Sequence, residues 1–112
     1  MEFDSNKPIF LQIYDSICEK ILSGEYPEGS RILSVRELGA EIGVNPNTVM
    51  RSYERLTFDN IIFNKRGIGY FISEGARETV LAKMRAEFLS EELPAILKKM
   101  ELLGIDRETL LK

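Results

Sequence analysis

"GVNPNTVMRSYERL", residues 43–56, contains a turn and the start of a helix. Asn45 is a favoured N-cap residue, because its side-chain oxygen accepts hydrogen bonds from the free amides of the first helical turn. Pro46 suits the first helical position, where its missing N–H breaks no hydrogen bond. The stretch therefore predicts a helix that begins at Pro46.

The predicted helix has two chemically different faces. At 100° per residue, its apolar side chains fall within about 60° of one another; they are Val49, Tyr53 and Leu56. The opposite side carries Asn47, Thr48, Arg51 and Arg55. Small polar residues at a helix N-terminus, with arginines one and two turns later, suit insertion into a DNA major groove. A capped helix with a solvated outer face is the alternative, and both stay open at this point.

A second helix is predicted just before this one. Ser34 and Glu37 have the spacing of a capping box, in which each side chain binds the backbone N–H of the other residue. Leu38 and Ile42 are expected to form the buried face of this helix, and Gly43 to end it. Two helices joined by a short turn that contains glycine are typical of a helix-turn-helix.

Residues 8–23 predict a further amphipathic helix at the start of the chain. Its apolar stripe consists of Ile9, Ile13, Ile17 and Ile21, flanked by Phe10, Tyr14 and Leu22. Pro8 suits the first turn and Gly24 suits the stop. Cys18 lies next to the stripe and is expected to be a small buried side chain, with redox sensing as the alternative.

A β-hairpin is predicted directly after the helix-turn-helix. Residues 61–64 and 70–73 have strand composition, and KRGIG between them is a tight turn. Asn60 is expected to end the preceding helix in the left-handed conformation. Lys65 and Arg66 stand at the tip, which is typical of a winged helix. An ordinary solvated turn is the alternative.

Composition argues against several classes of protein. The longest apolar runs are three residues and the N-terminus lacks a signal-peptide pattern, so a cytoplasmic protein without a membrane partner is expected. With no histidine and one cysteine, we expect no catalytic site, no metal site, no cofactor and no disulfide framework. Tyr14, Tyr53 and Phe88 are expected in the core. The chain is not expected to be an enzyme.

The last third of the chain predicts a helical tail with an interrupted apolar pattern. Leu81, Met84 and Phe88 follow steps of three and four, and the pattern resumes five residues later with Leu93, Ile96, Met100 and Leu103. The break falls near Pro94, which is expected to kink or interrupt the helix. Asp106 is expected to cap a last short helix that includes Thr109, Leu110 and Leu111. The expected fold class is thus mainly α with a small antiparallel β wing: a winged helix-turn-helix over residues 1–75 and a helical segment over residues 76–112.

Three blocks resemble the DNA-binding domain of the GntR family of bacterial transcription regulators: "PIFLQIYDSICEKILSGEYPEGSRI", "SVRELGAEIGVNPNTVMRSYERL" and "IIFNKRGIGYFIS". Together they cover roughly residues 8–73. The segment "VNPNTVMRSYERL" and the short tail resemble the YtrA-like subfamily in particular. The resemblance implies a repressor that binds a pseudo-palindromic operator as a homodimer, with an ABC-transporter operon among its targets.

The resemblance also implies which residues contact double-stranded DNA. The arginine of the SVREL block is Arg36. The start of the recognition helix supplies Asn45, Asn47, Thr48 and Arg51, and the wing supplies Lys65, Arg66 and Gly67. Arg55, on the outer face of the same helix, completes the expected set. Gly67 and Gly69 are expected to let the wing backbone approach a surface closely.

By the same resemblance, the tail helices hold two copies of the chain together. The expected dimerisation residues are Leu81, Met84, Phe88, Leu93, Ile96, Met100 and Leu103. Folding of the tail back on the winged helix is the alternative. The tail has no room for a large effector domain, so the presence of a small-molecule effector stays open.

The chain departs from the family pattern at four positions. Pro46 and Met50 stand where many members have arginine, Leu33 where proline is common, and Gly39 where alanine is common. Glycine at position 39 is expected to cost about 1 kcal/mol within a helix. These changes are expected to alter sequence preference and stability, and not to abolish function.

Net charge poses a problem for a DNA-binding protein, because the chain has 15 basic and 18 acidic residues and a formal charge of −3. DNA affinity depends on local neutralisation of phosphates, however, which a few converging cations supply. The expected cluster is Arg36, Arg51, Arg55, Lys65 and Arg66. A winged helix that binds another protein is the alternative function.

Overall fold

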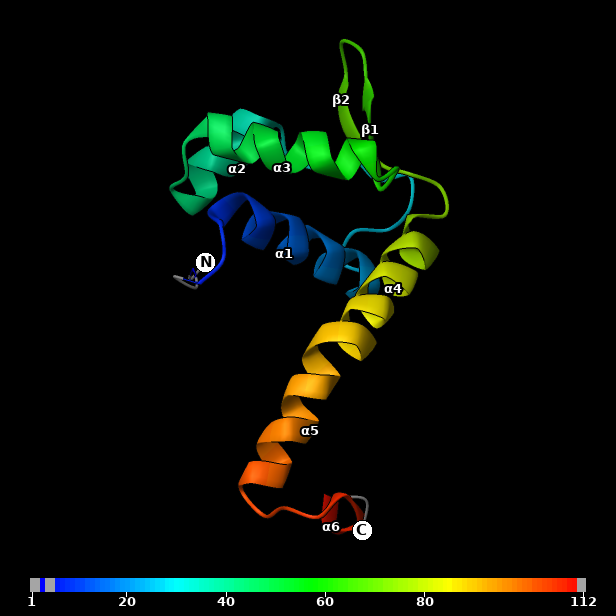
Figure 1. Ribbon diagram of the computed structural model, residues 1–112. Helices are drawn as coiled ribbons and strands as arrows, with labels where there is room; N and C mark the ends of the chain where they lie inside the picture. Colours follow the sequence, from blue (N-terminus) through cyan, green and yellow to red (C-terminus); the bar gives the residue numbers. More distant parts are fainter. Residues whose placement is uncertain (1–2, 4–5, 111–112) are drawn as a thin grey trace. The chain divides into compact units, whose positions relative to one another are not determined.

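The computed structural model describes residue 3 and residues 6–110, the last without its side chain. Three helices come first, and they are α1 (Ile9–Ser23), α2 (Val35–Ile42) and α3 (Pro46–Phe58). The strands are β1 (Ile62–Lys65) and β2 (Gly69–Ile72), and the helices after them are α4 (Ala76–Glu87), the π-helix η1 (Phe88–Glu92), α5 (Leu93–Leu102) and α6 (Arg107–Leu110) (Figure 1). The expected fold class is confirmed.

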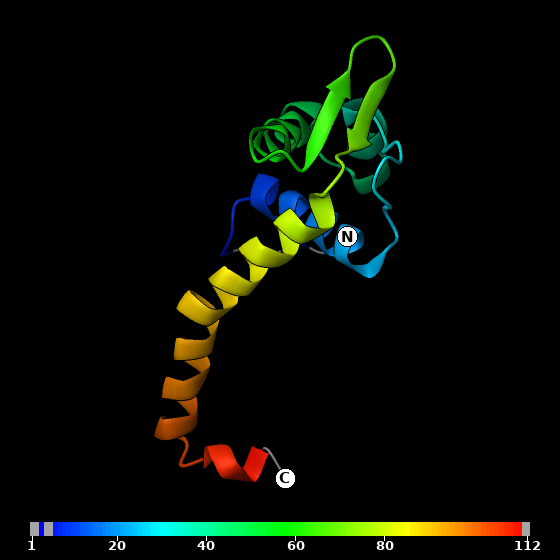
Figure 2. The same cartoon turned by 90° about the vertical axis from the view of Figure 1, so that its right-hand side faces the viewer.

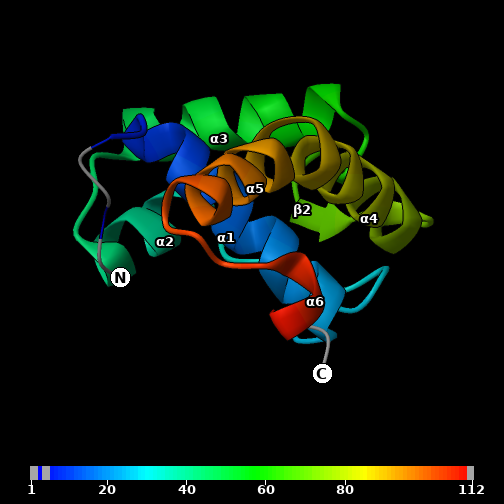
Figure 3. The ribbon, with the colours of Figure 1, turned by 60° about the horizontal axis from the view of Figure 1, so that its bottom comes forward.

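The core of the winged helix lies between α1, α2 and α3, which pack together in Figures 1 and 3. Its buried side chains include Ile13, Ile17 and Ile21 from α1 and Val49, Tyr53 and Leu56 from α3. Tyr14 is also buried, as expected, whereas Ile9 at the start of the stripe is exposed. Cys18 is 2% exposed, which confirms that it is a small buried side chain.

The ends of α1 and α3 follow the local chemistry of the sequence. Pro8 is the N-cap of α1, one position before the expected first turn, and Gly24 ends the helix with φ of 87°. Asn45 caps α3, whose first residue is Pro46, as predicted. Asn60 follows α3 with φ of 61°, the left-handed conformation that asparagine tolerates.

Gly39 packs against the turn of the helix-turn-helix, and the expectation about this residue needs correction. It is buried in α2, and a Cβ atom at this position would lie 2.7 Å from the carbonyl oxygen of Val44. Glycine is therefore required for the close approach of the turn, and its cost in helix propensity is offset by that packing.

We expect Gly39→Ala to lower the free energy of unfolding by about 1–3 kcal/mol, the usual range for overpacking a tight site. Denaturation by urea measures the change. Ala40→Gly, at the exposed neighbouring position, is the matched control and should cost only about 1 kcal/mol through helix propensity. A Gly39→Ala protein that is more stable than the wild type would contradict the assigned packing.

The wing contains a third short strand-like segment that the sequence did not predict. β1 and β2 pair antiparallel with Phe63 opposite Phe71, and the hairpin extends past α3 in Figure 1. Residues 29–32 bond to the free edge of β2, where Ile32 N–H donates to the Tyr70 carbonyl at 3.0 Å and Ile72 N–H donates to the Ser30 carbonyl at 2.9 Å. The loop before α2 is thereby tied to the wing.

The chain divides into two compact units, one up to Val80 and one from Leu81 onward. In the first unit, the Glu28 carboxylate accepts hydrogen bonds from the backbone N–H groups of Gly75 (2.8 Å) and Arg77 (3.3 Å). A carboxylate at this place satisfies the free amides at the start of α4. The expected domain boundary between residues 75 and 76 stays a prediction.

The second unit is one continuous helical path from Leu81 to Leu102, because the π-helix η1 joins α4 to α5 (Figure 2). The Leu93 N–H donates to the Phe88 carbonyl, five residues earlier. A five-residue step in a π turn takes the place of a four-residue step in an α turn. The α-helix is thus interrupted at residues 88–92, as expected near Pro94, but the helical path continues, since the extra residue of the π turn keeps the apolar pattern in phase.

The end of the tail forms a hook. Gly104 has φ of 68°, and Ile105 N–H donates to the Met100 carbonyl at 2.9 Å, so that α6 leaves the direction of α5 (Figure 2). Asp106 caps α6 by accepting from Glu108 N–H at 3.1 Å, as predicted. Leu111, expected in this helix, lies outside the described residues. Among the described residues, no helix is long and apolar enough to cross a membrane.

Candidate nucleic-acid interface

The start of α3 is fixed by its own cap. The Asn45 side-chain oxygen accepts from the Asn47 N–H at 2.8 Å, so this oxygen serves the helix and only the side-chain NH₂ group of Asn45 is left for a partner. Asn47 is exposed, whereas Thr48 is half-buried. Of the residues expected at the start of the recognition helix, Asn47 and Arg51 are therefore exposed side chains that the cap does not engage.

The outer face of α3 differs from the predicted one because Ser52 is completely buried. The buried stripe then consists of Val49, Ser52, Tyr53 and Leu56. At 100° per residue the centre of the opposite face falls on Asn47, Arg51, Glu54 and Phe58. Thr48 and Arg55 lie on the flanks of this face. Nothing in the sequence marked Ser52 as buried, since an isolated serine is usually exposed.

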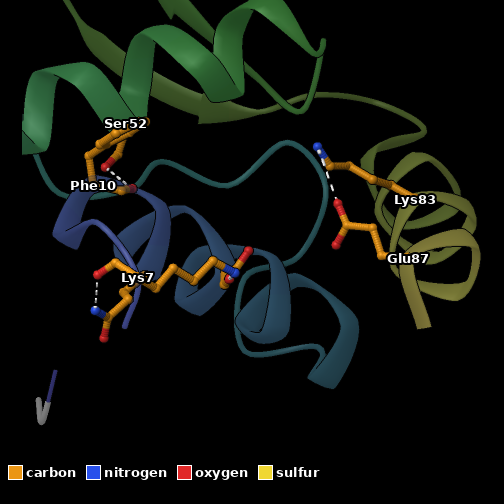
Figure 4. A network of polar contacts seen from close by, with 7 residues as sticks. Lys7, Phe10, Ser52, Lys83 and Glu87 are labelled. Atoms are coloured by element: carbon orange, nitrogen blue, oxygen red, sulfur yellow. Dashed lines mark hydrogen bonds and ion pairs between the residues drawn. The ribbon is translucent and has the colours of Figure 1, made fainter. Parts of the chain in front are cut away.

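Ser52 is buried without an energetic penalty because its hydroxyl has a partner. Its Oγ donates to the backbone carbonyl of Phe10 in α1 at 2.5 Å (Figure 4). The Arg51 guanidinium carbon lies 4.1 Å from the centroid of the Phe10 ring. Neighbouring residues of α3 therefore hold both the backbone and the side chain of Phe10.

Tyr53 fixes α3 to the wing and to the loop before α2. Its hydroxyl donates to the Leu33 carbonyl at 2.6 Å, and its ring meets the Tyr70 ring edge-on with centroids 4.9 Å apart. Burial raises the pKa of the Tyr53 hydroxyl well above its usual range, so it remains a hydrogen-bond donor at any physiological pH. This contact holds three elements of the candidate interface in a fixed arrangement.

Arg36 is exposed in the first turn of α2, directly after the capping box. Ser34 Oγ accepts from Glu37 N–H at 3.1 Å, and the Glu37 carboxylate accepts from Ser34 N–H at 3.0 Å. These bonds to Ser34 lower the pKa of the Glu37 carboxyl below its usual value. The cap thus sets the position from which Arg36 projects.

A lowered folded-state pKa means that the folded protein binds fewer protons than the unfolded chain. The contribution of Glu37 is therefore complete above its unfolded pKa of about 4.3 and is lost as the pH falls through the lower folded value. We expect Glu37→Gln, which keeps the capping geometry but cannot titrate, to flatten the loss of unfolding free energy below about pH 5. Urea denaturation at a series of pH values measures this, and identical pH profiles for the two proteins would contradict it.

The wing places its cations as predicted. Lys65 ends β1, Arg66 and Gly67 form the tip, and all three are exposed. Gly67 has φ of 79°, which favours glycine. The Lys65 ammonium lies 5.7 Å from the centroid of the Phe71 ring, which orients it without neutralising it.

Arg31 is a further cation at this surface that the sequence did not single out. Its backbone forms an isolated antiparallel β-bridge with Phe71. Its guanidinium occupies the space beside Gly69, where an added Cβ would lie 2.9 Å from Arg31 Nε. Gly69 therefore leaves room for the Arg31 guanidinium, and its expected part in the approach to a surface stays a prediction. The charge of Arg31 also lowers the pKa of Glu37, which places Arg31 near the start of α2.

Five expected DNA-contacting cations are exposed: Arg36, Arg51, Arg55, Lys65 and Arg66. Within the described part of the chain, none of them forms an ion pair with a carboxylate. Unpaired cations retain their full charge for a polyanion, which is the property that a phosphate-binding surface requires. The described residues also contain no cluster of three or more metal-ligating side chains.

Known proteins similar to this chain are bacterial transcription regulators. Residues 10–72 match the family model "Bacterial regulatory proteins, gntR family". The HTH-type transcriptional repressor YtrA of Bacillus subtilis is 36% identical over 95% of this chain and 81% of its own length. YhcF, an HTH-type transcriptional regulator of the same organism, is 35% identical over 99% of this chain and 90% of its own length.

A solved structure agrees with the fold over almost the whole chain. It is the GntR family transcriptional regulator from Listeria monocytogenes, with a TM-score of 0.78 and 32% identity over 97% of this chain and 94% of that one. The expected resemblance, including the resemblance to YtrA, is confirmed. The chain is a member of the GntR family of bacterial transcriptional regulators.

Proposed function

We propose that the chain is a sequence-specific, non-enzymatic repressor that acts in the cytoplasm and binds a pseudo-palindromic operator as a homodimer. The observation that supports this most strongly is the family match over residues 10–72 together with the unpaired cations that the matched region carries. The expected DNA contacts are made by Arg36, Asn45, Asn47, Thr48, Arg51, Arg55, Lys65, Arg66 and Gly67, to which we add Arg31.

The groups of this surface have different expected roles. Asn47 and Arg51 lie on the outer face of α3 and are the side chains best placed to meet base edges in a major groove. Arg36, Lys65 and Arg66 project from a helix start and a hairpin, where contacts to phosphates fix the register of the protein on the duplex. One protomer makes few such contacts, so two are needed for firm binding.

Exposure along the tail supports dimerisation. Phe88 is 42%, Ile96 47% and Leu103 63% exposed in the single chain, so the expectation that Phe88 belongs to the protomer core is wrong. Met84, Arg85, Phe88 and Leu89 line an open hollow of about 260 Å³ that a partner side chain can fill. Met100 is buried beside the hook within its own chain. Pairing of such apolar seams stabilises helix dimers.

A second function has one observation in its favour. Glu54 and the 82% exposed Phe58 share the outer face of α3 with Asn47 and Arg51. A carboxylate repels phosphate, and an exposed phenylalanine suits a protein partner. A winged helix that binds protein through α3 is therefore the second candidate, and DNA binding separates the two.

Selection of binding sites from a random pool of duplexes tests the proposed function. The proposal predicts enrichment of one inverted repeat, because a two-fold dimer presents two equivalent recognition helices. Enrichment of a single unrepeated site would contradict operator binding by a dimer. A pool without any enriched site would favour the protein-binding alternative. Control of an ABC-transporter operon and binding of an effector stay predictions.

Replacement of Lys65 by alanine should weaken binding to all duplexes alike. A lysine that contacts a phosphate releases about one counterion, so the slope of log affinity against log salt concentration should flatten by about 0.9. Titrations at several salt concentrations on specific and scrambled duplexes measure both effects. A loss confined to the specific duplex would show that Lys65 reads bases instead.

A further inference from the structure

Phe10 in the first turn of α1 is held by two consecutive residues of α3. Its carbonyl accepts the Ser52 hydroxyl at 2.5 Å, and its ring lies under the Arg51 guanidinium, 4.1 Å from centroid to carbon (Figure 4 shows the Ser52 bond). Ser52 is fully buried, so its end of this hydrogen bond lies in the core. The bond holds the Phe10 backbone against α3, and the ring projects from that backbone to Arg51.

The contact leaves the binding groups of Arg51 free. A guanidinium that stacks on an aromatic ring uses its π face, whereas its N–H groups point outward in the plane. Arg51 is exposed and, among the described residues, has no ion pair. Its edge thus keeps the fork of donors that binds a guanine edge or a phosphate with two hydrogen bonds.

We propose that Phe10 is a positioning residue that orders the Arg51 guanidinium for DNA before DNA arrives. The proposal rests on the proposed function and adds a residue to it. A free arginine side chain loses rotamer freedom when it binds, whereas a stacked one has already lost part of it. The Phe10 ring thereby increases the DNA affinity that the Arg51 guanidinium contributes.

A contact that DNA has to break would change the affinity in the opposite direction. If DNA required Arg51 to leave the ring, stacking would compete with binding, and removal of the ring would strengthen binding. The position of Arg51 on the outward face of α3 favours the first arrangement, because the side chain is exposed while it is in contact with the ring.

A double-mutant cycle on the operator duplex tests the proposal with Phe10→Leu, Arg51→Ala and the double variant. Leucine keeps an apolar side chain and the backbone carbonyl that Ser52 binds, but it offers no π face. We expect Phe10→Leu to weaken specific binding about three- to tenfold, because the free Arg51 side chain then regains rotamer freedom that it must lose again on binding DNA. In the Arg51→Ala background the same change should have no further effect. Phe10→Tyr keeps a π face and should bind like the wild type.

The outcomes separate this proposal from the proposed function. A wild-type protein that does not distinguish operator from scrambled duplex overturns both. A selective wild type combined with unchanged or tighter binding by Phe10→Leu, or with equal losses in both backgrounds, overturns the positioning role alone. The resonance of the Arg51 side-chain Nε–H in DNA-free protein gives a second readout. A ring-current shift that is present in the wild type and lost in folded Phe10→Leu is expected, and its absence in the wild type contradicts the contact.

Discussion

Ile96→Glu is expected to convert the protein to a monomer and to weaken operator binding by a factor of about 10²–10⁴, the usual gain from linking two binding units. The side chain is 47% exposed in the single chain, so a carboxylate there leaves the protomer fold intact. In a dimer it would place two like charges in an apolar interface, where unpaired charges are costly. Sedimentation and anisotropy measure the two effects.

Ala95→Glu is the matched control for this change. It introduces the same charge at the exposed neighbouring position of α5, which does not belong to the predicted apolar seam. The control should remain dimeric and bind the operator normally. A monomeric control, or a dimeric Ile96→Glu protein with full affinity, would show that the tail pairs through another face or does not pair.

Arg51→Ala is expected to weaken binding to the operator by about 1–3 kcal/mol, which is roughly five- to 150-fold, while binding to scrambled duplex changes less. The reason is that the Arg51 guanidinium is exposed on the outer face of α3 and is in contact with the Phe10 ring. Anisotropy titrations on both duplexes give the two affinities and hence the loss of discrimination.

Arg77→Ala removes the same charge from an exposed site outside the proposed interface and is the control for net charge. It should change both affinities little at physiological salt, where distant charges are screened. Equal losses for Arg51→Ala and Arg77→Ala would mean that general charge, and not a contact of α3, accounts for the effect.

The helices of the winged helix could be predicted closely because their ends depend on local chemistry. Each end is set by residues within one or two turns of it: a capping box at Ser34, an asparagine cap at Asn45 and glycines with positive φ. Features set by distant contacts were missed. The pairing of residues 29–32 with β2 joins segments about 40 residues apart, and no periodic pattern in residues 29–32 indicates it.

In the candidate site, too, features set by local chemistry could be predicted and features set by distant contacts could not. Exposure of the five cations followed from helix periodicity and turn chemistry. Burial of Ser52, the stacking of Arg51 on Phe10 and the place of Arg31 beside Gly69 all depend on how α1, α3 and the wing meet. In the tail, the five-residue step was visible in the sequence, but a proline can end, kink or widen a helix. The hydrogen bond from Leu93 N–H to the Phe88 carbonyl shows that the helix widens into a π turn here.

The most direct test of operator recognition is fluorescence anisotropy of the full chain on duplexes that tile the DNA upstream of its own gene, with a scrambled duplex of equal composition, at about 0.15 M salt. We expect one tile to bind at least about 10³-fold more tightly than the scrambled duplex, the usual lower bound for specific regulators. Equally weak binding to every tile and to the scrambled duplex would contradict sequence-specific regulation of its own gene by this chain.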